Sequence, residues 1–381
     1  MKLVFYSNFF NHHQEPLAQE FIKLLGEENY KFITTEYTRN DMNHCQLDQK
    51  LDNAPCVLQA YKYPEKAREL INKADCVIIS GLPVGYVSER LASGKLTFMQ
   101  SERFLKGPFT KDLMRLAKYY LYSGGRRAAK NPTSKFYLLC SSGFAAHDYK
   151  LCGLFKNKAY KWGYFPEVKR YDDINELISH KKQASIVWIS RLIDWKHPEL
   201  SVILARNLKA KGINFTLKII GDGYMKATLE SMINEWSLND CVELTGLMKI
   251  NEVRAELEKT QISLLTSDRG EGWGAVLNES MNSACVSVAA EKIGAVPFML
   301  QDNNNGLIFR DKDADDLTEK VLTLLNNPGK IQELGRNAYN TIINDWTPEL
   351  AAKRFITLWE ALNNNEEPVN VFESGLCSKI S

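Results

Sequence analysis

The sequence predicts an α/β protein built from two doubly wound domains. Short apolar segments of strand length alternate with segments of helical periodicity along most of the 381 residues, a pattern typical of a parallel sheet covered by helices on both faces. The alternation stops near residue 170 and then starts again. The chain is also too long for one core of ordinary size. We therefore expect two Rossmann-like domains, the first over residues 1–168 and the second over residues 169–346.

In the first half, four short apolar runs predict strands, and two periodic segments predict helices. The strands are expected at 3–6, 76–79, 96–99 and 136–139, and the helices at 15–25 and 64–71. The opening run is too short for the apolar core of a signal peptide, and no apolar run approaches 18 residues. We expect a cytoplasmic protein.

The second half repeats this order and ends in a further helix. Strands are expected at 185–189, 215–220, 242–244 and 262–265, and helices at 197–211, 225–236, 250–259, 276–283 and 314–325. A polar run near residues 169–173 is the predicted hinge. The segment 347–362 predicts a helix of its own, and the tail 363–381 is rich in Asn and Glu without periodicity, so we expect it to be poorly ordered.

Composition excludes several classes of protein. Hydrophobic residues make up 44% and charged residues 25%, as in ordinary globular chains rather than disordered or fibrous ones. The eight cysteines contain no C-x2-C pair, so we expect buried thiols and no zinc site.

Charge is distributed unevenly along the chain. Residues 1–170 carry 26 Lys and Arg against 16 Asp and Glu, and within them 102–170 carry 15 against 4. Such an excess indicates an anionic partner: a phospholipid surface, a nucleic acid or a polyanionic substrate. Apolar and basic residues alternate at helical spacing over 109–121, which fits an anionic membrane surface. An ordinary solvated surface helix fits this segment equally well. Nucleic acid is not expected, because no reader motif accompanies the charge.

The segments that follow the predicted strands of the second half carry the chemistry, because parallel sheets bind ligands at the carboxyl ends of their strands. Arg191 and Lys196 follow the strand at 185–189. Two cations there can clamp a diphosphate, the arginine as a planar fork and the lysine as a point charge. Taken alone, Arg191 and Lys196 are explained equally well as surface charges beside the N-terminus of a helix.

A second loop, Gly221-Asp222-Gly223, follows the strand at 215–220. Its glycines allow a backbone to approach a ligand closely. They do not complete a dinucleotide fingerprint, because Lys226 stands where the third glycine is required. The sequence has no Walker A motif either, so a dehydrogenase is disfavoured.

The strongest signal is the segment 270–279, which follows the strand at 262–265. Gly272, Trp273, Gly274 and Ala275 open a helix, and helix N-termini attract phosphate. Glu271 precedes that helix, and Glu279 lies roughly two turns further along than Glu271, on a similar face. Carboxylates repel a phosphate, so their presence beside a phosphate site needs a further reason. They would have one if they accept hydrogen bonds from vicinal hydroxyls of a sugar or ribose. A capping Glu271 and a solvated Glu279 are the simpler alternative.

In combination and order, these motifs resemble the retaining, GT-B-fold glycosyltransferases of sequence family 4, also called group 1. The resemblance covers residues 185–362 and rests on Ser190-Arg191-Leu192 with Lys196, Ile220-Gly221-Asp222-Gly223, Thr245-Gly246-Leu247, Glu271 to Glu279, 305–309 and Trp346-Thr347-Pro348. It implies two Rossmann-like domains facing a cleft, with helix 347–362 crossing back to the first domain.

The resemblance also implies the roles of individual residues. Arg191 and Lys196 would hold the donor diphosphate, and Glu271 would bind hydroxyls of the donor sugar. Glu279 would bind the ribose, Leu247 and Met248 would lie along the base, and Gly221 with residues 272–275 would complete the donor site. No cofactor and no catalytic metal are expected, since the nucleotide sugar is a co-substrate.

The first half is expected to bind the acceptor through polar residues that follow its strands. These residues are His12, Gln14, Glu102, Arg103 and His147. The function predicted is transfer of a sugar from a UDP or GDP sugar to a hydroxyl acceptor in bacterial cell-surface polysaccharide or glycolipid assembly, at the inner face of the membrane.

Two other functions stay open for the same fold. One is a nucleotide-sugar epimerase or hydrolase, and the other is a non-catalytic partner subunit with a degenerate donor site. The family pattern is interrupted in three places, at 283–286, at Phe298 and at the N-terminal loop 8–14.

Overall fold

The computed structural model describes residues 1–36, 51, 53–80, 86–107, 110–114, 125–364 and 371–380. It divides into two compact units. The first combines Met1–Glu167 with Asp345–Ser381, and the second is Val168–Asn344. Each unit is built on one sheet whose strands are almost all parallel, which confirms the predicted fold class.

The sheet of the first unit has the order β14-β7-β6-β5-β4-β1-β2-β3. Its strands are β1 (Leu3–Ser7), β2 (Tyr30–Thr34), β3 (Val57–Gln59), β4 (Cys76–Ser80), β5 (Thr97–Ser101), β6 (Phe136–Cys140), β7 (Ala159–Lys161) and β14 (Lys379–Ile380). All five residues of β1 are buried, as expected for a parallel strand with both faces covered. The chain runs from β1 outward to β2 and β3, and returns on the other side of β1 through β4.

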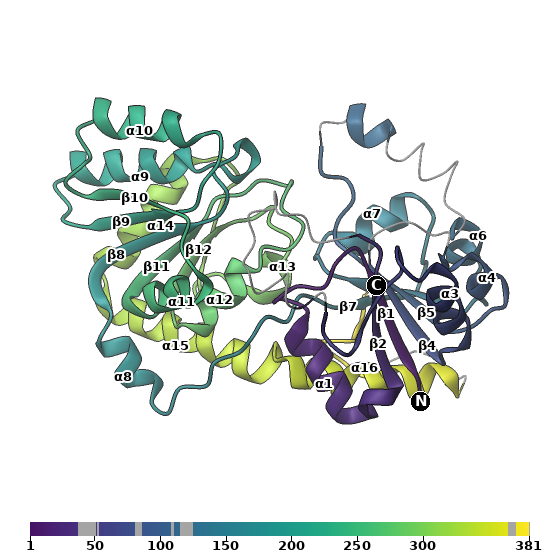
Figure 1. The fold of residues 1–381 in the computed structure, drawn as a ribbon. Helices are drawn as coiled ribbons and strands as arrows, with labels where there is room; N and C mark the ends of the chain where they lie inside the picture. The colour runs from purple at the N-terminus through teal and green to yellow at the C-terminus, as the bar shows by residue number, and fades with distance from the viewer. Residues whose placement is uncertain are drawn as a thin grey trace. The chain divides into compact units, whose positions relative to one another are not determined.

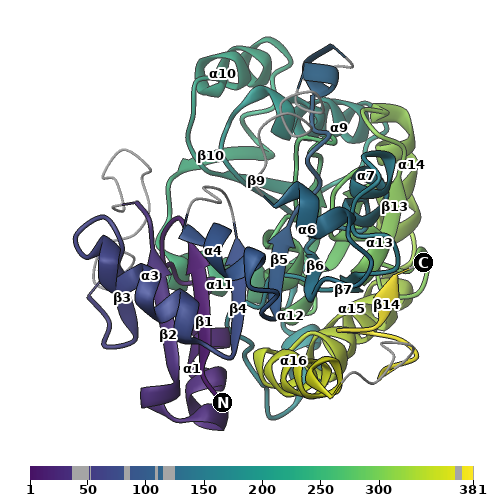
Figure 2. The same ribbon diagram turned by 90° about the vertical axis from the view of Figure 1, so that its right-hand side faces the viewer.

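Helices cover both faces of this sheet (Figure 2). They are α1 (Glu15–Leu25), α3 (Pro64–Lys73), α4 (Ser88–Ala92), α6 (Arg126–Lys130), α7 (Ala145–Leu151) and α16 (Pro348–Asn363), with a 3₁₀ turn at Glu27–Asn29. Helix α16 contacts α1 on one face of the sheet, and α3 contacts α4 on the other face.

Helix α16 completes the core of the first unit although it comes from the end of the chain. Its Phe355 is fully buried, and its ring lies 5.6 Å from that of Phe21 and 5.0 Å from that of Phe98. Trp162 adds a third ring at 5.8 Å. Thr347 caps the helix, because its side chain accepts a hydrogen bond from the amide of Leu350 at 3.1 Å.

The expectation of a poorly ordered tail is wrong for residues 371–380. Strand β14 pairs antiparallel with β7, with Lys379 opposite Tyr160. Leu376 and Cys377 are buried, and Arg354 donates hydrogen bonds to the carbonyls of Ser374 and Leu376. The tail has no helical periodicity because Lys379 and Ile380 form a two-residue strand, which pairs with the edge strand β7 of the sheet.

The sheet of the second unit has the order β10-β9-β8-β11-β12-β13, with all pairs parallel. Its strands are β8 (Lys182–Ile189), β9 (Thr216–Ile220), β10 (Val242–Gly246), β11 (Thr260–Leu265), β12 (Val286–Ala290) and β13 (Leu307–Phe309). The chain leaves β8 for β9 and β10, and then crosses to β11 on the other side of β8. The direction of winding therefore reverses between β8 and β11, where doubly wound sheets bind ligands.

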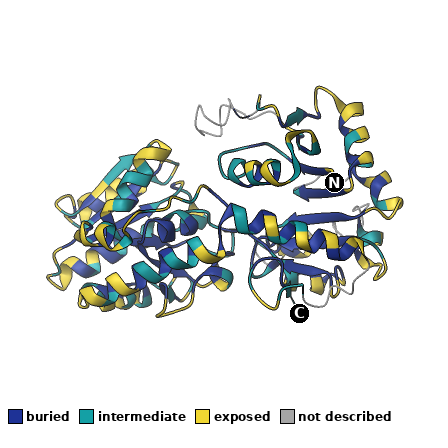
Figure 3. Ribbon diagram, turned by 90° about the horizontal axis from the view of Figure 1, so that it is seen from below, coloured by how far each residue is buried: buried dark blue, intermediate teal, exposed yellow. Residues whose placement is uncertain are grey.

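Figure 1 shows the helices of this unit on both faces of its sheet. Helix α9 (Glu199–Ala210) contacts both α10 (Lys226–Glu235) and α14 (Ala314–Leu325), and α11 (Ile250–Lys259) contacts α12 (Val276–Asn282) on the opposite face. The remaining helices are α8 (Ile174–Ser179), α13 (Val296–Met299) and α15 (Pro328–Asp345). Strands β11 and β12 are almost wholly buried, whereas the helices carry both buried and exposed residues (Figure 3).

The predicted basic helix over 109–121 lies mostly outside the described residues. Residues 110–114 are helical, and Leu113 and Met114 are 54% and 66% exposed. None of the helices in the described ranges combines the length and the apolar character needed to cross a bilayer.

Candidate functional site

The loop after β8 is shaped by the glycines after β9. Leu192 donates a backbone hydrogen bond to the carbonyl of Asp222 at 2.9 Å, and Met225 donates one to the carbonyl of Leu192 at 3.0 Å. A Cβ on Gly221 would lie 1.8 Å from the carbonyl oxygen of Ser190. A Cβ on Gly223 would lie 2.4 Å from that of Leu192. Gly221 and Gly223 are thus required by the approach of the two loops.

This packing fixes Arg191 at the carboxyl edge of the sheet. Arg191 is exposed, and its guanidinium lies 5.6 Å from the ring centroid of Trp195. The ammonium of Lys196 lies 4.4 Å from the same ring. The indole therefore holds both predicted cations by cation–π contacts, a role that the sequence reasoning did not assign to Trp195.

Lys196 reaches across the reversal point of the sheet. It follows β8 in the short 3₁₀ turn Asp194–Lys196, and its ammonium pairs with the Oε2 atom of Glu271, which follows β11. Both side chains are largely buried, with 11% and 14% exposed. Ser267 donates to the same carboxylate oxygen at 3.3 Å. The structure thus brings together two of the three residues predicted as catalytic, which lie 75 positions apart.

The loop after β11 is tied to the loop after β8 by backbone contacts. The amide of Asp268 donates to the carbonyl of Trp195 at 3.0 Å, and the amide of Glu271 donates to the carbonyl of Asp268 at 3.0 Å. Between them, a Cβ on Gly270 would lie 3.3 Å from atoms of Trp195. A glycine at 270 allows the loop to lie against the indole and so positions Glu271.

The segment 272–275 leads into α12, which begins at Val276. The Trp273 side chain is fully buried and donates from Nε1 to Asn278 at 2.9 Å, so this residue reaches a ligand only through its backbone. Gly274 has φ +94°, and a Cβ there would lie 3.1 Å from Ile293. Glu279 lies half-buried in the first turn of α12.

The residues predicted to lie along a base follow β10. The amide of Gly221 donates to the carbonyl of Gly246 at 2.9 Å, which joins this loop to the one after β9. Leu247 is 59% exposed, whereas Met248 packs against the buried cluster of Val187 and Ile220. Tyr224 is exposed, and its hydroxyl accepts a hydrogen bond from the amide of Asp194 at 3.0 Å.

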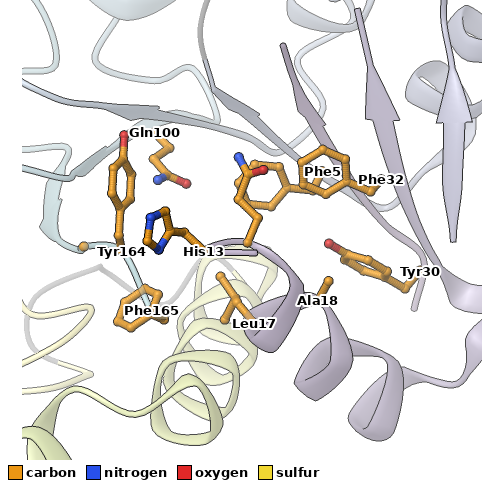
Figure 4. Close-up of a pocket in the computed structure, with 11 residues that line it drawn as sticks. Phe5, His13, Leu17, Ala18, Tyr30, Phe32, Gln100, Tyr164 and Phe165 are labelled. Carbon is orange, nitrogen blue, oxygen red and sulfur yellow. The ribbon is translucent and has the colours of Figure 1, made fainter. Parts of the chain in front are cut away.

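In the first unit, one of the predicted acceptor residues, Gln14, lines a pocket, which Figure 4 shows. The space is about 290 Å³, including the part open to solvent. Its lining residues come from β1, β2, β5, the start of α1 and the segment after β7, and they are Phe5, His13, Gln14, Leu17, Ala18, Tyr30, Phe32, Gln100, Gly163, Tyr164 and Phe165. Gln14 lines it, and Glu102 accepts a hydrogen bond from Tyr164 at 2.7 Å.

Gln100 is one of the pocket residues that the sequence analysis missed. It is 7% exposed, and its Oε1 atom has no hydrogen-bond partner among the described residues. A buried amide oxygen without a partner is costly unless a water or a ligand hydroxyl supplies a donor. Gln100 belongs to strand β5, and nothing in the sequence around it indicates that its side chain lines a pocket.

The other predicted acceptor residues lie in different surroundings. The ring of His12 stands 3.9 Å from that of His13. Arg103 is buried at 9% exposure, with its guanidinium 4.4 Å from the Phe144 ring and 3.8 Å from the carboxylate of Asp148. His147 is exposed on α7 and is not part of the pocket lining.

The described residues contain no group of three His, Cys, Asp or Glu side chains placed to hold a metal ion. In Asp311-Lys312-Asp313, the side chain of Asp313 accepts from the amides of Asp315 and Asp316 and caps α14. Asp313 therefore acts as a helix N-cap rather than as a metal ligand.

The second unit is thus a doubly wound α/β unit, whose loops after β8 and β11 pair at the reversal point of its parallel sheet. Residues 169–341 match the family model described as glycosyl transferases group 1. Over this segment the chain matches the family that the motifs predicted.

The curated relatives match over parts of their length. The chain is 34% identical to an uncharacterized glycosyltransferase of Methanocaldococcus jannaschii over 33% of this chain and 35% of the relative. It is 24% identical to a putative colanic acid biosynthesis glycosyltransferase, WcaL, of Escherichia coli over 46% and 45%. It is 26% identical to a poly(ribitol-phosphate) alpha-N-acetylglucosaminyltransferase of Staphylococcus aureus over 51% and 39%. The chain thus spans between about a third and a half of the length of these relatives.

The likeness to solved structures extends over both units. The Anabaena protein HepE, in a structure with UDP, aligns with a TM-score of 0.69 at 14% identity, covering 96% of this chain and 100% of that one. At this identity the likeness concerns the fold, which is GT-B.

Proposed function

We propose that this protein is a glycosyltransferase that moves a sugar from a nucleotide diphosphate sugar to a hydroxyl acceptor, with retention at the anomeric carbon and without a metal. The observation that carries the proposal is the pairing of Lys196 with Glu271 at the reversal point of the second sheet, with Arg191 held against Trp195 in the same loop as Lys196. The match of residues 169–341 to the family model and the UDP in the HepE structure support a nucleotide-diphosphate donor, of the UDP or GDP type.

The donor diphosphate would lie between the loop after β8 and the start of α12. Arg191 is exposed and held by Trp195, so its guanidinium is available as a two-pronged donor. The pairing of Lys196 with Glu271 orients both groups before a donor arrives. Glu271 would then accept hydrogen bonds from sugar hydroxyls, while Glu279 would serve the ribose, and Leu247 with Met248 would lie along the base.

Catalysis would follow from the charge that develops on the leaving diphosphate. As the glycosidic bond breaks, negative charge accumulates on the phosphate nearest the sugar. Arg191, Lys196 and the amides of 272–275 would bind that charge more tightly in the transition state than in the ground state. The leaving phosphate would take the acceptor proton on the same face of the sugar, which gives retention.

The acceptor would bind to the first unit. The pocket of Gln14, Gln100 and Tyr164 is lined by both aromatic and polar side chains. This combination suits a sugar or another hydroxyl-bearing group. The excess of basic residues over 102–170 suits an anionic acceptor or its lipid carrier. One relative is named for poly(ribitol-phosphate) as acceptor and another for colanic acid biosynthesis, which supports a role in cell-surface polysaccharide assembly on the cytoplasmic side of the membrane.

The experiment is a screen of UDP and GDP sugars with acceptor glycans, followed by NMR of the first product. We expect transfer from one donor class with the α- or β-configuration of the donor preserved in the first product formed. Inversion at the anomeric carbon would overturn the retaining mechanism. Release of free sugar or an epimer without acceptor would favour a hydrolase or epimerase, and donor binding without turnover would favour a non-catalytic partner subunit.

A further inference from the structure

His197 occupies an unusual backbone position beside the candidate donor site. It follows Lys196 directly and has φ +48°, in the left-handed region. Its ring is held from both sides by carboxylates, with Nδ1 2.7 Å from Oε1 of Glu199 and Nε2 3.3 Å from Oδ2 of Asp268. A neutral imidazole has one N–H and cannot donate to both, whereas an imidazolium can. The geometry thus requires the charged ring for both bonds.

Asp268 joins this histidine to the rest of the site. Its Oδ2 also accepts from Lys312, which follows β13, at 3.0 Å, and its Oδ1 accepts from the amide of Gly270 at 2.7 Å. Its backbone accepts from the amide of Glu271, as described above. One carboxylate therefore connects the loops that follow three strands, β8, β11 and β13.

We propose that His197, acting as an imidazolium between Glu199 and Asp268, is a positioning residue that fixes the loop 268–271 and so holds Glu271 against Lys196. This inference deepens the proposed function and rests on it. His197 touches neither Glu271 nor Lys196 through its ring, and its role is to restrain Asp268. Lys312 supports the same carboxylate from the opposite side.

The charges around the ring determine its protonation. Hydrogen bonds to Asp268 and then to Glu199 raise the pKa of His197 to about 9 against the opposing effect of burial. Asp194 and Asp311 add negative charge near the ring. Lys312 opposes this effect on the ring, and Lys292 lies near Asp311 and offsets its charge. Because the pKa in the folded protein is above the ordinary 6.5, the stabilising effect of this charge is complete below pH 6.5 and is lost as the pH rises through about 9.

The test compares His197→Asn with His180→Asn in the full-length protein. Asparagine tolerates a left-handed backbone, so the first variant removes the ring with little backbone strain, and His180 is an exposed histidine of the same unit. We expect kcat of His197→Asn to fall about tenfold or more, because a misplaced Glu271 slows the chemical step. The donor KM should change by less than about threefold, because the contacts to the diphosphate remain. His180→Asn should behave as wild type.

The pH profile separates positioning from a purely structural role. We expect kcat of the wild type to decline above about pH 9, Glu199→Gln to move that decline to lower pH, and His197→Asn to lack it. A His197→Asn variant with wild-type kcat, or one whose pH profile still shows the decline, would overturn the inference.

A measurement without turnover makes the outcome independent of the proposed function. In ¹⁵N-histidine-labelled protein, the signal assigned by its absence in His197→Asn should show both ring nitrogens protonated at pH 7.5. A ring that titrates near 6.5 overturns the inference whether or not transfer is detected. A wild-type protein that shows this imidazolium but transfers no sugar from any donor contradicts the proposed function instead.

Discussion

Gly221 and Gly223 show how single residues determine the position of Arg191. Both have positive φ, +145° and +156°, and both face backbone carbonyls of the loop that carries Arg191. Any side chain at either position would displace that loop. The glycines were predicted to allow a ligand to approach, but the close approach in the structure is made by the protein's own backbone.

Gly221→Ala tests this role against Gly212→Ala. Gly212 also has positive φ, +70°, but a Cβ there would meet no atom within 4 Å. We expect Gly212→Ala to lower the free energy of unfolding by about 1 kcal/mol through backbone strain alone, with unchanged kcat. Gly221→Ala should cost about 3 kcal/mol, because overpacking adds to the strain, and should lower transferase activity. Chemical denaturation and initial rates measure both effects, and equal behaviour of the two variants would show that Gly221 does not position the loop.

Residues whose role depends on distant contacts could not be predicted from the sequence. Arg191, Lys196 and Glu271 were recognised because each follows a predicted strand end. His197, Asp268 and Lys312 follow strand ends as well, but no local pattern shows that they meet. Arg90 is similar, since it is fully buried and donates to four backbone carbonyls and to the hydroxyl of Thr97, all of them outside its own helix α4.

At the scale of elements, α16 packs into the core of the first unit. Its buried face carries Ala351, Phe355 and Trp359, and Phe355 lies among rings from α1 and β5 and from the segment just after β7. The periodicity of 348–362 was enough to predict the helix, because amphipathic helices leave a clear signal. Strand β14 has two residues, and so short a strand has no periodicity to detect.

Phe355→Ala tests the contribution of α16. Removing this ring from a packed core should lower the free energy of unfolding by about 3–5 kcal/mol. Thr357→Ala, at an exposed position of the same helix, should change it by less than about 0.5 kcal/mol. Thermal unfolding measures both. A small effect of Phe355→Ala would mean that the first unit folds without α16.

At the scale of the whole molecule, the two parts of the chain differ in net charge. Residues 1–170 carry the basic excess, and the remainder is acidic. Net charge of this kind affects association with anionic surfaces rather than the fold. The proposed donor site lies on the acidic part of the chain, so its cations act locally, whereas the basic excess lies on the part proposed to bind the acceptor.

Vesicle flotation tests the basic excess directly. We expect binding to phosphatidylglycerol vesicles at 0.1 M salt, loss of binding in 1 M salt, and no binding to phosphatidylcholine vesicles, because exposed basic residues contribute about 1 kcal/mol each near an anionic surface. Arg127→Glu with Lys130→Glu, both exposed on α6, should weaken binding more than Lys211→Glu with Lys259→Glu, which are exposed in the second unit. Equal binding to both lipids would remove the support for a membrane-presented acceptor.

The most direct measurement is calorimetric titration of UDP and GDP into wild type and Arg191→Ala, with Lys211→Ala as the control cation. The predicted result is saturable binding of one nucleotide by wild type and Lys211→Ala, and at least about tenfold weaker binding by Arg191→Ala, because a charged hydrogen bond is worth about 1.5–3 kcal/mol. The unfolding temperature of Arg191→Ala should match that of wild type, since the side chain is exposed. Binding of neither nucleotide by wild type, or equally tight binding by Arg191→Ala, would contradict the assignment of a diphosphate site to the loop after β8.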